Sequence, residues 1–240
     1  MDDRVLPQAL HALAQLGLID LRENDLPTVL GRIAEVAKQT IPGTAEASVT
    51  LVRGAVATTA AYTGYLALRL DERQYEVEHG PCVDAAVGSV LVSVPDMAND
   101  DRWVQFAQTA VAAGVRASLS VGLPVQDALV GALNLYGTAP HAFDDDAVDL
   151  ARTFGSYAAI ALANAHLYAS SAALAAQMQQ AMESRSTIDQ AIGIMMVLHG
   201  CDSEAGFDLL VRASQAANRK LRDIAKDIVD TAAARANGTP

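Results

Sequence analysis

The chain has 240 residues and a formal net charge of -11, because 28 acidic residues outnumber 17 lysines and arginines. Hydrophobic residues make up 51% of the chain and charged residues 19%, which excludes a disordered polymer and is typical of one large or two small folded domains. We see neither a secretory signal nor an uninterrupted apolar run of about 18 residues, so we expect a cytoplasmic protein without a membrane span. Cys82 and Cys201 are far apart in the sequence and are expected to be reduced thiols.

The first part of the chain predicts two helices, two strands and a less regular segment. An apolar stretch at residues 5–21 predicts a short docking or dimerisation helix, and apolar residues at three- and four-residue spacing predict a second helix at residues 26–39. Residues 47–54 and 55–64 predict two paired strands. Residues 65–80 are polar and less regular, and we expect no regular element there.

Three more strands, a helix and a very long helix follow. The strands are predicted at residues 90–96, 117–125 and 130–137, and the shorter helix at residues 102–115. From Asp144 to Leu198 no proline interrupts a helix-forming run, which would measure about 80 Å if continuous. Sequential strand pairs with helices clustered at the ends are typical of an α+β domain with an antiparallel sheet.

Apolar side chains recur every seven residues along the long helix. They are Ile160, Leu167, Leu174, Ala181, Ile188 and Met195. The partner positions are less regular, with Asn164, Ser171, Met178, Arg185 and Ile192. The repeat predicts a parallel coiled-coil homodimer, with packing of this alanine-rich helix inside one chain as the alternative.

The C-terminal part predicts two further helices and carries a basic cluster. Residues 1–175 contain 10 basic and 20 acidic residues, whereas residues 176–240 contain 7 and 8. Gly200 should end the long helix, Asp202 or Ser203 should cap the next one, and a last helix should begin near Arg219. A polyanion should be repelled by the first part and accepted, if anywhere, by the C-terminal part.

The last helix separates its charges by position. Its apolar face consists of Leu221, Ile224, Ala225, Ile228 and Val229. At helical spacing Arg222 and Lys226 flank this face, and we expect Asp223, Asp227 and Asp230 on the opposite side. The alternative is that Asp223 and Lys226 form an ordinary exposed pair worth a few tenths of a kcal/mol.

Three stretches, residues 78–96, 106–125 and 130–165, resemble a GAF domain, and the resemblance covers roughly Leu18 to Leu167. It implies an antiparallel-sheet sensory fold. It does not select a ligand, because GAF domains bind cyclic nucleotides, haem, bilins, small metabolites or nothing known. The ligand-binding residues and the cofactor therefore stay unknown, with a small molecule as a possible partner.

The same region contains three weak candidates for chemistry, His79, Cys82 and His141. The structural alternative for the turn at Gly80 and Pro81 is an ordinary helix start, and the run Asp144–Asp146 also suits a helix start. One GAF relative group, the methionine-sulfoxide reductases, relies on several cysteines, whereas this region has only Cys82. We assign no catalytic residue and no metal site, and we do not expect an enzyme.

Residues 184–233 resemble an ANTAR domain, a three-helix RNA-binding module of bacterial transcription antiterminators. The matching positions are Arg185, Ile188, Ala191, Gly193, Met196, Ala205, Leu209, Ala213, Asn218, Leu221, Ala225 and Ile228. Ile192 departs from the family, in which many members carry lysine, and its lack of charge would weaken or retune RNA affinity.

The resemblance and the charges together assign an RNA-contact set. It consists of Arg185, Gln190, Ala191, Gly193, Arg212, Asn218, Arg219, Lys220, Arg222 and Lys226. Ala191 and Gly193 would leave a shallow place for a looped-out base, with close helix packing as the alternative. Asn218 would read a base edge or cap the last helix. Because the region has no tryptophan or tyrosine, we do not expect aromatic stacking platforms.

We therefore expect an antiparallel α+β GAF domain joined by a long helix to an all-α ANTAR domain. The expected segments are an N-terminal helix (1–20), the GAF domain (21–168), a coiled-coil linker (169–183) and the ANTAR domain (184–235). The predicted function is signal-responsive transcription antitermination through RNA hairpin loops, by a homodimer. The alternatives are a GAF small-molecule or redox sensor whose C-terminal helices serve only dimerisation, and an enzyme that uses Cys82.

Overall fold

The computed structural model describes residues 23–54, 56–124, 129–236 and 238, with the isolated positions 14, 17 and 20. The helix expected at residues 5–21 falls almost entirely outside these residues. The described chain divides into two compact units, Met1–Ala169 and Ser170–Pro240. Each unit is described by itself below.

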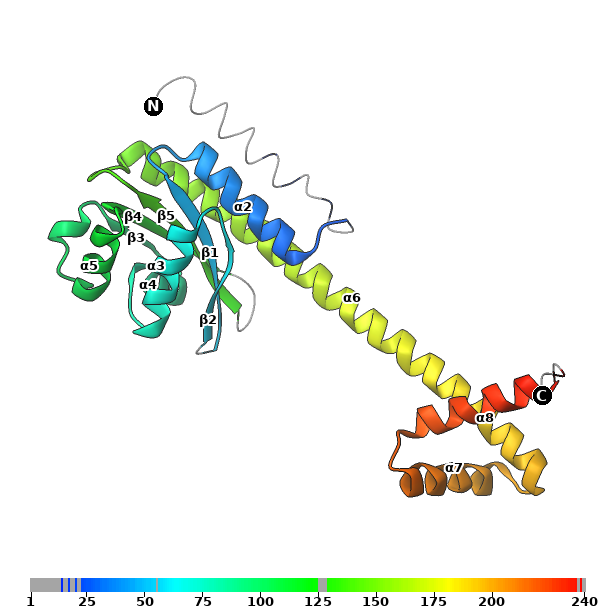
Figure 1. The fold of residues 1–240 in the computed structure, drawn as a ribbon. Helices are drawn as coiled ribbons and strands as arrows, with labels where there is room; N and C mark the ends of the chain where they lie inside the picture. The colour runs from blue at the N-terminus through cyan, green and yellow to red at the C-terminus, as the bar shows by residue number, and fades with distance from the viewer. Residues whose placement is uncertain are drawn as a thin grey trace. The chain divides into compact units, whose positions relative to one another are not determined.

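A five-stranded antiparallel sheet with the order β2-β1-β5-β4-β3 forms the N-terminal unit (Figure 1). Its strands are β1 (Glu46–Arg53), β2 (Val56–Tyr62), β3 (Leu91–Val94), β4 (Ala117–Pro124) and β5 (Leu129–Gly137). The helices around it are α2 (Leu26–Thr40), α3 (Tyr65–Glu76), α4 (Pro81–Gly88), the short 3-10 turn η1 (Met97–Asn99) and α5 (Val104–Ala112). The expected α+β class with an antiparallel sheet is confirmed.

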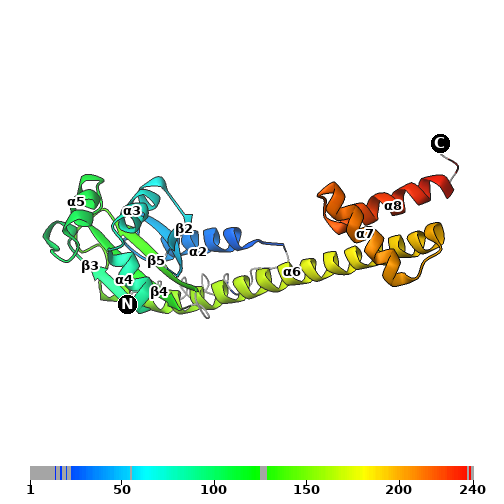
Figure 2. The same cartoon turned by 90° about the horizontal axis from the view of Figure 1, so that it is seen from below.

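The two faces of the sheet differ in polarity. Leu119, Val121 and Leu123 of β4 point into a large apolar core with α2 and the first part of α6 (Asp145–His199). Ser118 and Ser120, which alternate with them, are buried on the other face. Figures 1 and 2 show α2 and α6 on one face of the sheet and α3, α4 and α5 on the other. The second face is therefore a buried but polar layer.

Residues 65–76 form α3, which corrects the expectation of no regular element there. The side of α3 that packs on the sheet contains Ala67, Leu70, Asp71 and Gln74, all buried. Two of these four side chains are polar, so the apolar spacing that marks an amphipathic helix is interrupted. The polar layer of the sheet is thus the physical reason why the sequence pattern conceals this helix.

Helix α6 runs over 55 residues without interruption. Phe154, Ala158 and Leu162 lie in the core of the N-terminal unit. Among the described residues, α6 is long and apolar enough to cross a membrane by length and composition, with a window of mean hydropathy 1.2. One such helix is weak evidence for a membrane span, because the core helix of a soluble protein passes the same test.

A row of large apolar side chains on α6 is exposed in the single chain. Ile160 and Leu167 are each 60% exposed, Leu174 is 58% exposed and Met178 is 61% exposed. These are positions of the seven-residue repeat. Ile188, Ile192 and Met195 of the same repeat pack inside the chain against the core of the C-terminal unit, so only the part from Ile160 to Met178 is left exposed.

The C-terminal unit is a three-helix arrangement of the end of α6, α7 (Ser203–Ala217) and α8 (Leu221–Ala236). Gly200 adopts a left-handed conformation after α6, with φ 64°. The Asp202 side chain accepts a hydrogen bond from the backbone N–H of Ala205 at 2.9 Å and caps α7. The predicted end of the long helix and the predicted cap are confirmed.

Gly122 of β4 marks the closest approach between the sheet and α4. A Cβ atom at this position would overlap the carbonyl oxygen of Ala85 and lie 2.7 Å from the Cα of Ser89. Because both atoms belong to backbone, a clash cannot be relieved by rotation of a side chain. The polar layer is therefore held close to its helical cover at this point.

We expect Gly122→Ala to reduce the free energy of unfolding of the N-terminal unit by about 1–3 kcal/mol, the usual cost of overpacking. Gly31→Ala in α2 is the control, since a Cβ at Gly31 meets nothing within 4 Å and alanine is the better helix former by about 1 kcal/mol. Urea denaturation followed by circular dichroism measures both. A Gly122→Ala variant with the wild-type free energy of unfolding would contradict the close packing.

Candidate RNA-binding surface and sensory site

The C-terminal unit is held together by a small core. Ala191 of α6, Leu210 of α7 and Ala225 of α8 are fully buried, and apolar side chains from all three helices surround them. Ala191 therefore acts in packing, and its side chain does not lie on the surface where the sequence analysis placed it. Gly193, by contrast, is exposed, and a Cβ there would meet nothing within 4 Å. Close helix packing within the chain is thus not the reason for glycine at 193.

Helix α7 crosses α6 closely at Gly206. A Cβ at Gly206 would lie 3.4 Å from both Cγ2 and the backbone oxygen of Ile192. Ile192 is half-buried and packs against the small core. Its apolar side chain therefore fills the crossing, which explains isoleucine at a position where a charge was expected to face RNA.

The connection between α7 and α8 is a tight turn centred on Asn218. Asn218 adopts a left-handed conformation with φ 50° and forms the C-cap of α7, so it does not cap α8 as one alternative held. The N–H of Arg219 donates to the carbonyl oxygen of Ser214 at 3.1 Å. The Ser214 hydroxyl donates back to the carbonyl oxygen of Arg219 at 2.5 Å. These contacts fix where the basic cluster begins.

The predicted cations are all exposed, but several are paired. Arg219 Nη1 donates to Asp227 Oδ2 at 2.7 Å, which corrects the expectation that Asp227 points away from the basic cluster. Arg185 Nε lies 3.9 Å from Asp189 Oδ2, and Arg222 Nε lies 3.6 Å from Asp223 Oδ1. The sequence analysis missed the Arg219–Asp227 pair because it compared angular positions on α8 alone, whereas Arg219 reaches in from the preceding turn.

The remaining members of the set are free to contact a ligand. Arg212, Lys220 and Lys226 are exposed and have no ion-pair partner among the described residues. Gln190 is also exposed. Phe207 of α7, 41% exposed, is an aromatic side chain that the sequence analysis overlooked by considering only tryptophan and tyrosine. It offers a surface on which an unpaired base can stack.

The buried polar layer of the N-terminal unit centres on Asp71. Tyr136 Oη donates to Asp71 Oδ1 at 2.5 Å, and the Thr59 hydroxyl donates to Oδ2 at 2.9 Å. The Asn134 amide Nδ2 lies within 3.3 Å of Oδ1. Burial raises the pKa of Asp71 to about 6, although these hydrogen bonds act in the opposite direction. The carboxyl group therefore changes its protonation near neutral pH.

The layer extends from Asp71 into α4. Gln74 Nε2 donates to Tyr136 Oη at 3.3 Å, and Gln74 Oε1 accepts from the backbone N–H of Cys82 at 2.8 Å. Burial raises the pKa of the Cys82 thiol, which disfavours the reactive thiolate. His79 Nδ1 lies 3.8 Å from Asp84 Oδ1 on the surface, and His141 is exposed. Cys82 is fully buried, and its backbone N–H belongs to the hydrogen-bonded layer.

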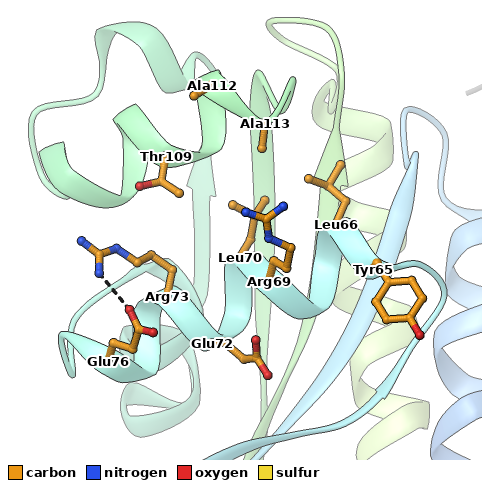
Figure 3. Close-up of a pocket in the computed structure, with 10 residues that line it drawn as sticks. All are labelled: Tyr65, Leu66, Arg69, Leu70, Glu72, Arg73, Glu76, Thr109, Ala112 and Ala113. Carbon is orange, nitrogen blue, oxygen red and sulfur yellow. Dashed lines mark hydrogen bonds and ion pairs between the residues drawn. The ribbon is translucent and has the colours of Figure 1, made fainter.

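The described residues hold no group of three or more His, Cys, Asp or Glu side chains placed to bind a metal ion. An open groove of about 600 Å³ lies between α3 and α5. Figure 3 shows α3 side chains on one wall and Thr109, Ala112 and Ala113 on the other. Arg69 and Arg73 are balanced by Glu72 and Glu76, so the groove favours neither anions nor cations.

The model of the GAF domain family matches residues 23–163, and the ANTAR domain model matches residues 176–229. The chain is a GAF domain followed by an ANTAR domain. Both resemblances found in the sequence are confirmed. The pair combines a sensory domain with an RNA-binding domain of the antitermination type, and suggests a soluble regulatory protein. No curated protein matches the chain.

Solved structures show the GAF fold at low identity. The chromophore-binding domain of a bacteriophytochrome from R. palustris is 14% identical with a TM-score of 0.53, and the match covers 69% of this chain and 63% of that one, less than two thirds. The free methionine-R-sulfoxide reductase of Neisseria meningitidis is 17% identical with a TM-score of 0.54, over 72% and 95% of the chains. The GAF domain of an Acinetobacter phosphoenolpyruvate-protein phosphotransferase is 13% identical with a TM-score of 0.51, over 70% and 97%.

The pKa of Asp71 predicts how the stability of the GAF domain depends on pH. Because the folded-state pKa is raised from 3.8 to about 6, the contribution of this group is greatest below pH 3.8 and is lost as the pH rises through 6. The ionised carboxylate costs about 3 kcal/mol at pH 7. We expect Asp71→Asn to remove most of this loss between pH 4.5 and 7, measured by chemical denaturation.

Thr59→Ser keeps both the carboxyl group and the hydroxyl donor, and should retain the wild-type pH dependence. An Asp71→Asn variant that loses stability with pH as the wild type does would show that another group is responsible.

Proposed function

We propose that this GAF–ANTAR protein is a cytoplasmic, non-enzymatic antitermination regulator whose GAF domain senses a signal and whose ANTAR domain binds RNA hairpin loops. The carrying observation is the ANTAR match, which coincides with the exposed cations Arg212, Lys220 and Lys226. Binding to a hairpin would disfavour formation of a competing terminator. The segments 1–20, 21–168, 169–183 and 184–235 remain our domain boundaries.

The RNA-contact surface in this proposal consists of exposed side chains around α7 and α8. Lys220, Arg222 and Lys226 contact phosphates, and Arg185, Gln190 and Arg212 extend the surface onto α6 and α7. Gly193 leaves room for an approaching base, and Phe207 supplies a stacking face. The acidic GAF domain repels the same ligand, which confines binding to the C-terminal unit.

Replacing Arg222 and Lys226 with glutamine should weaken RNA binding and flatten its salt dependence. Each lost single-strand phosphate contact lowers the slope of log K against log salt by about 0.7. Glutamine keeps helix propensity, and both positions are exposed, so circular dichroism should show an intact fold. The assay is fluorescence anisotropy of a pool of RNA hairpins with one fixed stem and randomised loops, over a salt series.

Asp230→Asn, on the same helix, is the control and should leave the salt slope unchanged. If the Arg222 and Lys226 variant has the same salt slope as the Asp230 variant, α8 is not part of the RNA-contact surface. Absence of any hairpin binding by the wild-type chain would favour the second function, a GAF sensor whose C-terminal helices only dimerise.

We also propose a homodimer through α6, supported by the exposed apolar row Ile160, Leu167, Leu174 and Met178. Two copies would present two ANTAR domains, so that two neighbouring hairpins could be held together. A possible small-molecule ligand of the GAF domain would act by changing this assembly.

Leu167→Asp combined with Leu174→Asp should yield monomers, because each helix would bury two unpaired charges in the seam. Ala169→Asp with Ala176→Asp adds the same charge on the far side of the helix and should leave the dimer intact. Sedimentation velocity distinguishes the two. If the leucine variant stays dimeric, the seam lies elsewhere.

A further inference from the structure

The ion pair between Arg219 and Asp227 is open to solvent. Arg219 Nη1 and Asp227 Oδ2 are 2.7 Å apart, and the two side chains are 49% and 56% exposed. An ion pair this exposed contributes little to stability, because water and salt compete for both charges. Another anion can therefore replace the carboxylate at little cost to the fold.

The position of Arg219 is defined by its backbone. Its N–H and its carbonyl group are both hydrogen-bonded to Ser214, and the preceding residue, Asn218, holds the left-handed turn. The guanidinium is then held over the first two turns of α8 by Asp227. A ligand that replaces Asp227 meets an arginine whose backbone is already fixed by the turn, so part of the ordering cost of binding is already met.

The surroundings of the pair attract anions. Lys220 directly precedes α8 and Lys226 directly precedes Asp227, and neither has an ion-pair partner among the residues that the structure describes. The carbonyl oxygen of Lys220 accepts hydrogen bonds from the N–H groups of Asp223 and Ile224, so the positive end of the helix dipole lies beside Arg219. Asp223 also acts on the Arg219 guanidinium, but Lys220, Lys226 and the helix dipole place Asp227 where the local field favours negative charge.

We propose that Asp227 occupies a phosphodiester subsite on Arg219, and that an RNA phosphate displaces it when the ANTAR domain binds. The carboxylate oxygen stands in for a phosphate oxygen, and the guanidinium can bind either anion through two parallel N–H groups. Asp227 is then an internal competitor that lowers the affinity for every polyanion. This inference rests on the proposed RNA binding. It concerns Asp227, which is not a member of the RNA-contact set.

The first test compares Asp227→Asn with Asp230→Asn in the full-length chain. Both variants remove one negative charge from α8, but only the first frees Arg219. Using the hairpin pool with randomised loops, we expect D227N to bind about three- to fivefold more tightly than D230N at the same salt concentration. The salt slope of D227N should equal that of the wild type, because the same phosphates are contacted.

The second test removes the arginine. R219Q should bind more weakly and show a salt slope smaller by about 0.7, and the D227N substitution should give no more gain than D230N in the R219Q background. Circular dichroism reports whether R219Q folds. If R219Q does not fold, the comparison of D227N with D230N still tests the proposal.

The outcomes separate the two claims. If the wild type binds hairpins but D227N and D230N are equal, the subsite is refuted and the proposed function survives. If D227N binds more weakly than D230N, Asp227 supports Arg219 in the complex and displacement is refuted. A wild-type chain that binds no hairpin refutes the proposed function, and the subsite with it.

Discussion

Continuity of helix α6 is the constraint on which the rest of the structure depends. The helix contributes Phe154 and Leu162 to the core of the GAF domain and Ala191 to the core of the ANTAR domain. Each domain therefore takes part of its core from the same helix. Between these cores the helix exposes Leu174 and Met178, which leaves it available to a second copy. In the proposed function, a signal that changes the packing or the partner of this helix would couple sensing to RNA binding.

Polarity is distributed differently in the two domains, and each distribution suits its role. The GAF domain keeps a polar layer inside, where Asp71 has a pKa near 6 and three hydrogen-bond donors. The ANTAR domain has an apolar core and keeps its polarity outside, where basic residues meet their acidic neighbours. A buried carboxyl group responds to protonation or to desolvation, whereas exposed ion pairs respond to a competing polyanion.

Much of the fold followed from the sequence because its elements have regular apolar spacing, as α2 and the strands β4 and β5 do. Helix α3 did not, because Asp71 and Gln74 replace apolar residues on its buried side. The candidate RNA-binding surface could be predicted from the sequence only in part. Helical spacing identified Lys226 as exposed, but the pairing of Arg219 with Asp227 depends on the turn at Asn218, which no periodicity reveals. Ala191 likewise required the crossing of three helices to be recognised as core.

The central claim is that RNA is bound by the ANTAR domain and not by the acidic GAF domain. Ultraviolet crosslinking of the full-length chain to the randomised hairpin pool, followed by mass spectrometry of the crosslinked peptides, tests it most directly. We expect the crosslinks within residues 184–235, at the exposed faces of α7 and α8 and at the end of α6. Crosslinks concentrated within residues 23–163 would contradict the account.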